Sequence, residues 1–134
     1  MKVSPEALWE AYQARRDVRA AALGERVDVW FQNYCKNWVM RDWYLFAPSL
    51  AQHVQNLLAR VAVLRFLLLS DPRLVEALAI TDGEARARRC DALAVEVFYA
   101  FARTVEHSDA FLAAITASLE QFSTVAHAIC LLRF

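Results

Sequence analysis

The chain of 134 residues contains only two glycines and three prolines, and this scarcity limits what it can fold into. Antiparallel sheets need frequent turns, and turns draw heavily on these two residue types. A chain with so few of them is expected to form long helices joined by few connections. A hydrophobic share of 58% is enough to bury a substantial core. The sequence therefore predicts an all-α, single-domain bundle of five to seven helices over residues 1–134.

Capping residues predict where the helices begin and end. Ser4 followed by Pro5 is typical of a helix start, and Gly24 of a helix end. Ser108 or Asp109 is expected to cap a later helix in the same way. Further helices are expected over residues 25–45, 49–69, 84–106 or 84–107, in a short piece after Pro72, and in a last apolar segment near 125–132.

The most apolar segment is "VAVLRFLLL", residues 61–69, and Arg65 lies in its middle. A bilayer-spanning helix needs about 20 apolar residues, so we interpret this segment as a central core helix and expect no membrane partner. The preceding helix carries an aromatic stripe at three-and-four spacing, which favours core packing, with stacking on a ligand as the alternative. Its members are Val27, Trp30, Phe31, Tyr34, Trp38 and Val39.

Charge and motif content exclude several function classes. Fifteen basic residues balance fifteen acidic ones, so no nucleic-acid partner is expected. The three cysteines form no CxxC pair and the three histidines lack metal-ligand spacing, so no metal site is expected. The amino-terminal residues contain no apolar signal segment, and reduced thiols in the cytoplasm are the expectation.

The stretch "FARTVEH", residues 101–107, is the main candidate for chemistry. Arg103 lies three residues before Glu106 and four before His107, so it can reach either side chain on one helix face. One interpretation is an ordinary helix end joined to the next helix by hydrogen bonds. The other is a polar site in which Glu106 or His107 acts as a general base or a substrate contact.

Arg65 is the second candidate, because a buried guanidinium needs a partner. Glu106 is its expected partner if the helices that carry the two residues are antiparallel neighbours. Arg60, five residues earlier, is expected to reach the rim of the core instead. The candidate polar site thus comprises Arg65, Arg103, Glu106 and His107.

Three stretches, in this order, resemble the C-terminal helical region of the flagellin lysine-N-methylase family over residues 27–134. Asn33 and Tyr34 match a motif of the type E-N-Y-L. Leu64, Arg65 and Phe66 give a looser match to a second motif. The strongest match is to F-x-R-x-x-E-H-x-x-x-F-L, and its residues are Phe101, Arg103, Glu106, His107, Phe111 and Leu112. We favour a fold signature over a functional site for the last motif.

The resemblance implies transfer of methyl groups from S-adenosylmethionine to lysines of flagellin. Family members carry a cysteine-rich stretch, thought to hold an iron–sulfur cluster, which this sequence lacks. We therefore expect a short relative or a fragment, with no cofactor held by this chain alone and with S-adenosylmethionine implied only by the resemblance. Its expected role is substrate recognition or support, with Glu106 facing the substrate ammonium and with Arg103 and His107 orienting it.

Two other functions remain open from the residues alone. The aromatic surplus and the apolar carboxyl end, which stops at Phe134, fit a non-catalytic protein-interaction module that forms a homodimer. A bundle that binds a small ligand in an apolar pocket under the aromatic helix fits the same stripe of rings. Flagellin or another protein is the expected partner if the chain is methylase-related or an interaction module.

Overall fold

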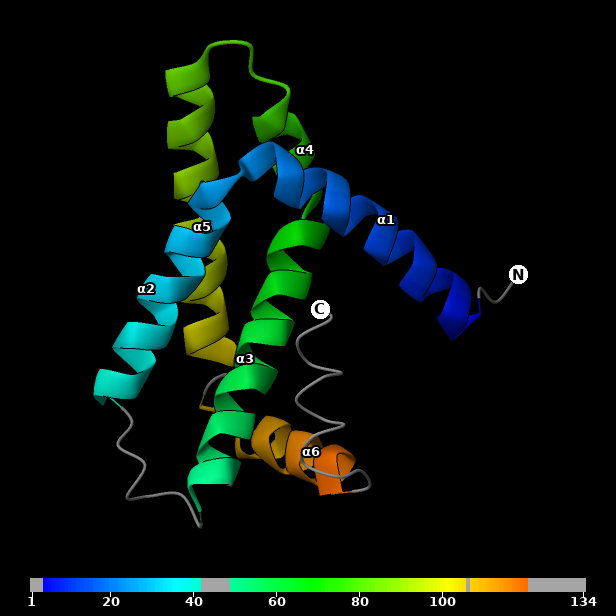
Figure 1. The fold of residues 1–134 in the computed structure, drawn as a ribbon, viewed down its shortest axis with the longest axis vertical. Helices are drawn as coiled ribbons and strands as arrows, with labels where there is room; N and C mark the ends of the chain where they lie inside the picture. The colour runs from blue at the N-terminus through cyan, green and yellow to red at the C-terminus, as the bar shows by residue number, and fades with distance from the viewer. Residues whose placement is uncertain (1–3, 42–48, 106, 121–134) are drawn as a thin grey trace.

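Helix α3 (Leu50–Ser70) lies at the centre of the fold, as Figure 1 shows. It contacts four other helices: α1 (Pro5–Leu23), α2 (Glu25–Arg41), α4 (Pro72–Leu78) and α5 (Gly83–Thr104). Helix α6 (Asp109–Glu120) follows α5 after a short turn. The structure is a computed structural model that describes residues 4–41, 49–105 and 107–120.

The all-α prediction is confirmed, because the described residues form six helices and no strand. The predicted caps are confirmed where they can be seen. The Ser4 hydroxyl accepts the Ala7 N–H at 3.2 Å, and the Ser108 hydroxyl accepts the Phe111 N–H at 3.2 Å. Gly24, with a φ of 57°, ends α1 in the left-handed region that favours glycine. The predicted last helix and the end of the second predicted helix lie outside the described residues.

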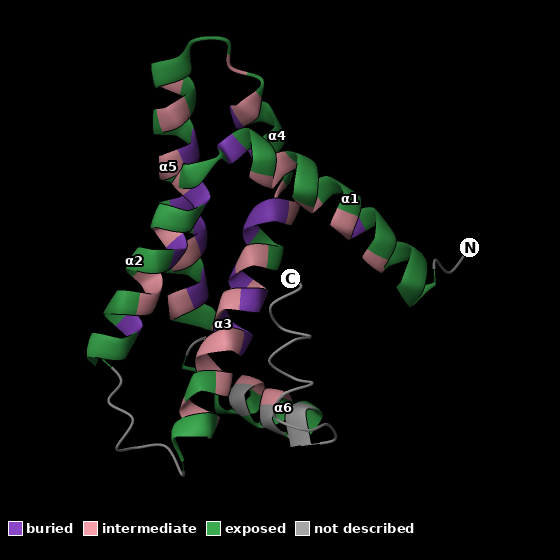
Figure 2. Cartoon of the chain, viewed as in Figure 1, coloured by how far each residue is buried: buried purple, intermediate pink, exposed green. Residues whose placement is uncertain are grey.

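The core forms where α2, α4 and α5 meet α3 (Figure 2). The side chains of Leu64, Leu68 and Leu69 on α3 are fully buried, as are Leu74 on α4 and Leu93 on α5. Helix α5 turns one apolar stripe into the core, since Cys90, Leu93, Ala94, Val97 and Phe101 are all buried. Each fully buried leucine removes enough apolar surface from water to contribute about 2 kcal/mol. The central position that the sequence predicts for α3 is therefore confirmed.

Helix α1 is peripheral, and two contacts attach it to α3. The Tyr12 ring is buried, and its centroid lies 4.9 Å from that of Phe66. Burial raises the pKa of Tyr12, so the phenol stays neutral. The Arg19 guanidinium donates to the backbone carbonyl of Leu69 near the carboxyl end of α3, where a cation also meets the negative end of the helix dipole.

An ion-pair bridge fixes the α4–α5 hairpin to the end of α3. Arg73 lies 2.8 Å from the Asp71 carboxylate and 2.7 Å from the Glu96 carboxylate. Asp71 also caps α4 by accepting the Arg73 N–H at 2.9 Å. The side-chain hydrogen bond from Arg73 lowers the pKa of Asp71. A lowered folded-state pKa means that this stabilisation is present at neutral pH and is lost as the pH falls below about 4.

Helix α3 is also the one described helix that is long and apolar enough to cross a membrane by length and composition. The core helix of a water-soluble protein passes the same test, and α3 is surrounded by other helices. It carries two arginines, Arg60 and Arg65, that pack against rings of α2. Its packing is that of a core helix, as the sequence predicts.

Replacing Leu68 by alanine is expected to lower the free energy of unfolding by about 2–5 kcal/mol, because the loss of a fully buried side chain leaves a cavity in the core. Urea denaturation followed by circular dichroism measures the change. The matched control is Val75→Ala on α4, whose side chain is 51% exposed. The control is expected to stay within about 0.5 kcal/mol of the wild type. Equal effects of the two variants would show that α3 is not the core helix.

Candidate functional site: an aromatic groove between α2 and α5

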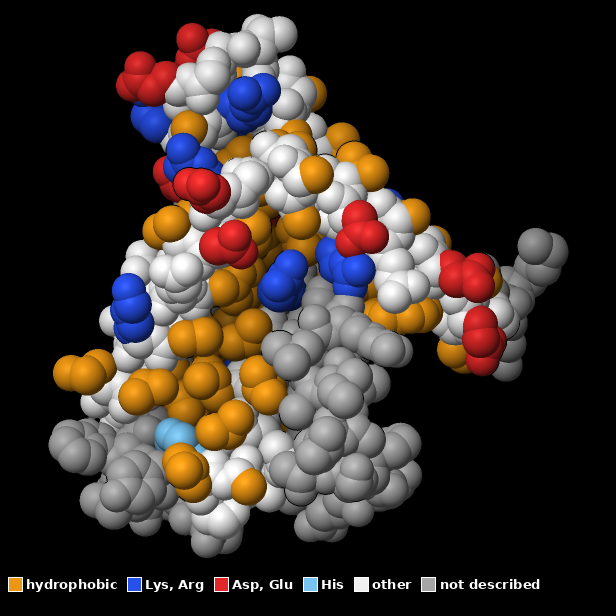
Figure 3. All heavy atoms as spheres, viewed as in Figure 1, with side chains coloured by type: hydrophobic (Ala, Val, Ile, Leu, Met, Phe, Trp, Pro, Cys, Tyr) orange, Lys and Arg blue, Asp and Glu red, His pale blue; other side chains and the backbone are white. Residues whose placement is uncertain are grey.

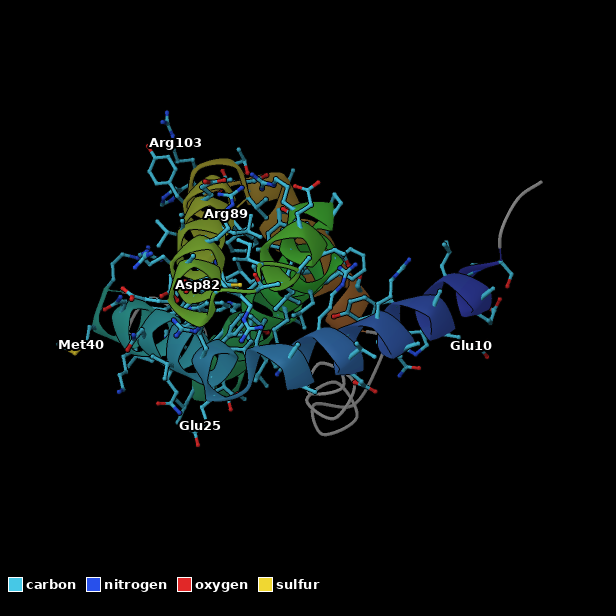
Figure 4. All side chains as sticks on the ribbon, turned by 90° about the horizontal axis from the view of Figure 1, so that it is seen from above. Glu10, Glu25, Met40, Asp82, Arg89 and Arg103 are labelled. Carbon is cyan, nitrogen blue, oxygen red and sulfur yellow. The ribbon has the colours of Figure 1, made fainter. Side chains whose placement is uncertain are left out.

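The structure describes three of the four residues that the sequence grouped as a polar site, namely Arg65, Arg103 and His107. Arg103 is exposed on α5, donates to the Tyr99 hydroxyl at 3.0 Å, and points away from the bundle in Figure 4. His107 is exposed in the turn after α5. Arg65 lies half-buried over the Phe31 ring of α2, 5.8 Å from its centroid. Glu106 lies outside the described residues, so its pairing with Arg65 and its substrate role stay predictions.

The prediction for Arg60 is wrong, because its side chain is only 7% exposed. Arg60 lies four residues before Leu64 and eight before Leu68, which puts it on the buried stripe of α3. Its guanidinium lies 5.6 Å from the Trp38 ring centroid and donates to the Asn56 carbonyl at 3.0 Å. Its place just before the apolar segment was therefore a poor guide to its burial.

The arginines of α3 lie against aromatic rings of α2. Neither Arg60 nor Arg65 forms an ion pair with any residue that the structure describes, and the Nε atom of each is buried without a hydrogen-bond partner. Cation–π attraction to Trp38 and Phe31 offsets part of the desolvation cost. These two arginines therefore help to hold α2 on α3.

A groove of about 630 Å³ runs between α2 and α5. We name it the α2–α5 groove. Its walls are aromatic rings and small apolar side chains, with two amides and one guanidinium among them. The α2 wall consists of Trp30, Asn33, Tyr34, Asn37, Trp38 and Arg41, and the α5 wall of Ala94, Val95, Phe98, Tyr99 and Ala102.

Ring packing explains why the two helices leave this groove. The Phe98 ring lies 5.3 Å from the Phe31 ring and 5.5 Å from the Tyr34 ring, measured between centroids. These large rings keep the two backbones apart, while Ala94 and Ala102 on α5 fill little of the space beside them. The result is an open groove with a ring-lined floor.

An ion pair fixes one end of the groove. The Asp91 carboxylate of α5 accepts from Arg26 at 2.6 and 2.8 Å and from the Trp30 indole N–H at 2.9 Å. Residue numbers increase in the same direction along α2 and α5, because Arg26 contacts Asp91 and Tyr34 contacts Phe98. The two helices therefore run parallel. The carboxyl ends of both helices therefore lie at the other end of the groove.

The groove offers ring surfaces, two amides and one guanidinium to a ligand. Among the described residues, its lining contains no Asp, Glu, His, Lys or Cys, the side chains that most often transfer protons near neutral pH. Burial raises the pKa of the Cys35 and Cys90 thiols, so both stay protonated and are poor nucleophiles. Within the part of the chain that the structure describes, no group of three potential ligands could hold a metal ion.

Sequence reasoning found the aromatic stripe of α2 and favoured core packing for it, with stacking on a ligand as the alternative. Val27, Phe31 and Trp38 are buried, whereas Val39 is 54% exposed. Sequence reasoning also missed Asn33 and Asn37 as groove residues. The available signal was their spacing, since two amides four residues apart lie on one face of a helix beside the rings.

The fold and the groove define an all-α helical domain with an open, ring-lined groove on one side. A scan against protein families matches residues 2–131 to the FliB lysine N-methylase C-terminal domain. The chain belongs to this family, and the resemblance found in the sequence is confirmed. The match also takes in α1, which precedes the resembling residues 27–134. Neither the curated proteins nor the solved structures contain a match to the chain.

Some of the residues that carry the family resemblance lie in the core, and others line the groove. Phe101 is buried, and its ring meets that of Phe111 edge to face at 6.2 Å, which ties α6 to α5. These two residues act as a fold signature. Asn33 and Tyr34, by contrast, line the α2–α5 groove.

The Arg26–Asp91 pair is expected to couple α2 to α5 in a double-mutant cycle. Arg26 and Asp91 side chains are 39% and 46% exposed, so solvent screens the pair, and a coupling of roughly 0.5–1 kcal/mol is expected. The variants Arg26→Ala, Asp91→Ala and the double variant are compared by urea denaturation. The coupling should shrink between 0.05 and 0.5 M salt. A coupling of zero at low salt would show that the pair does not join the helices.

Proposed function

We propose that this chain recognises the protein substrate of a lysine-methylating enzyme, with flagellin or a flagellin-like protein as the substrate. Family membership supplies the enzyme class. The single observation that supports a recognition role is the open, ring-lined groove between α2 and α5. Aromatic side chains contribute large contact areas at low conformational cost, which is why they dominate protein-binding surfaces.

The groove suits recognition better than methyl transfer. Methylation requires a neutral lysine amine and therefore a route for its proton, and the described residues of the groove lining include no carboxylate or imidazole to accept one. S-adenosylmethionine and the transfer step are accordingly assigned to a catalytic part outside this chain. The free thiols of Cys35 and Cys90 fit a cytoplasmic protein.

The test is the affinity of the chain for fluorescently labelled flagellin monomer, measured by anisotropy. Val95 lines the groove and is 69% exposed, so Val95→Glu places a charge in the groove without disturbing the core. We expect this change to weaken binding at least tenfold. Val75→Glu on α4, at 51% exposure, is the matched control and is expected to leave the affinity within twofold.

Two outcomes would overturn the proposal. Flagellin binding that is equal in the two valine variants would move the contact away from the groove, and no binding by the wild-type chain would remove the recognition role. Calorimetric titration with S-adenosylmethionine is a separate control. Heat of binding at millimolar ligand would return the cofactor to this chain.

Self-association is a second candidate, supported by an apolar surface at the end of α2 and the start of α3. Four side chains there are substantially exposed and border a hollow of about 420 Å³: Val39, Met40, Leu50 and Val54. Figure 3 shows hydrophobic side chains gathered over this part of the molecule. Light scattering is expected to give a dimer that Met40→Glu converts to a monomer. A monomer at all concentrations would remove this candidate.

A further inference from the structure

Two amides on the wall of the α2–α5 groove have no partner within the described protein. Asn33 and Asn37 are both exposed, both line the groove, and neither side chain forms a hydrogen bond with another described residue. A carboxamide offers an acceptor and two donors. It can therefore pair with both the N–H and the C=O of a peptide backbone, a property that no apolar groove residue shares.

The spacing of the two amides matches that of an extended peptide. Four residues of α-helix rise about 6 Å, which separates Asn33 from Asn37 along the groove. In an extended chain, every second residue presents its N–H and C=O on the same side, and two residues span about 6.6 Å. The two amides can therefore pair with two successive backbone sites of a segment that runs parallel to α2.

The rings of the groove suit the side chains of such a segment. Alternate side chains of an extended peptide point to opposite faces, so those on one face can enter the groove while the others meet solvent. Tyr34, Phe98 and Tyr99 offer ring surfaces, and Ala94 and Ala102 leave room between them. A helical ligand would satisfy its own backbone and leave both amides without a role.

Charge complementarity defines one end of the ligand. No carboxylate lines the groove in the described part of the chain, and nearby Asp91 already accepts from Arg26 and Trp30. At the carboxyl ends of the parallel helices, Arg41 lines the groove and Arg103 lies over the Tyr99 ring, 5.6 Å from its centroid. An acidic residue of the ligand fits this end best.

We propose that the α2–α5 groove binds an extended segment of the substrate protein. Asn33 and Asn37 pair with its backbone, the rings hold its alternate apolar side chains, and an acidic residue lies toward Arg103. This inference rests on the proposed recognition of a protein substrate, and it specifies the conformation and the charge of the recognised segment.

The experiment uses overlapping 15-residue synthetic peptides that cover flagellin, together with intact flagellin, against the full chain. We expect at least one peptide with alternating apolar residues and an acidic residue to bind. Asn33→Ala with Asn37→Ala should weaken its binding at least tenfold, since two sets of backbone hydrogen bonds are lost. The matched control is Gln32→Ala with Lys36→Ala, an exposed pair at the same spacing on α2 outside the groove. It should leave the affinity within twofold.

Two further variants separate backbone pairing from general damage. N-methylation of alternate peptide bonds removes the donors that face α2 and should abolish binding, whereas methylation of the intervening bonds should be tolerated. Arg103→Glu should weaken the same peptide at least threefold at low salt and should not weaken a peptide in which alanine replaces the acidic residue. Circular dichroism confirms that each variant is folded.

The failures of the two proposals give different results. One result would overturn the extended-segment inference alone: intact flagellin binds and Val95→Glu abolishes that binding, but no linear peptide binds and the two-asparagine variant behaves as wild type. The groove would then recognise a folded surface. If neither flagellin nor any peptide binds, the recognition role itself fails. If a peptide binds the wild type, the two-asparagine variant and Val95→Glu with equal affinity, its contact lies elsewhere and the inference is wrong.

Discussion

Burial of α3 is the constraint on which the rest of the structure depends. Its residues Leu64, Leu68 and Leu69 are fully buried, and apolar side chains extend around most of the helix. A helix of this kind is stable in water only if other helices cover it on several sides. Helices α1, α2, α4 and α5 provide that cover, each through a limited apolar face of its own. The positions of α2 and α5 are therefore set by α3 and not chiefly by each other.

The groove follows from this arrangement. Because α2 and α5 both pack on α3, their outer sides face solvent along parallel lines, and the rings of Phe31, Tyr34 and Phe98 fill only the floor between them. The Arg26–Asp91 pair closes one end. A few large side chains thus produce an open surface without any irregular backbone. A site built on helices in this way holds its side chains more firmly than one built on loops.

Much of the fold could be predicted from single residues, because helix ends and apolar stripes are local signals. Ser4, Gly24 and Ser108 mark ends, and the stripe from Cys90 to Phe101 marks the buried side of α5. The site was harder to predict, because it depends on contacts across the chain. The partners Arg26 and Asp91 lie 65 residues apart, and only the fold brings them together. The error for Arg60 has a similar origin, since the Trp38 ring that accommodates its charge belongs to another helix.

The polar residues of the chain have different roles according to their depth. On α3, Arg60 and Arg65 lie against rings of α2 and have their Nε atoms buried, so they cannot exchange partners without opening the core. On the outer wall of α2, Asn33 and Asn37 are exposed, and a ligand that approaches the groove can reach them without any rearrangement. A candidate for chemistry chosen by burial and charge alone therefore leads to the arginines, which hold the helices together. If candidates are instead chosen as unpartnered polar groups beside an open apolar surface, the amides of α2 are selected.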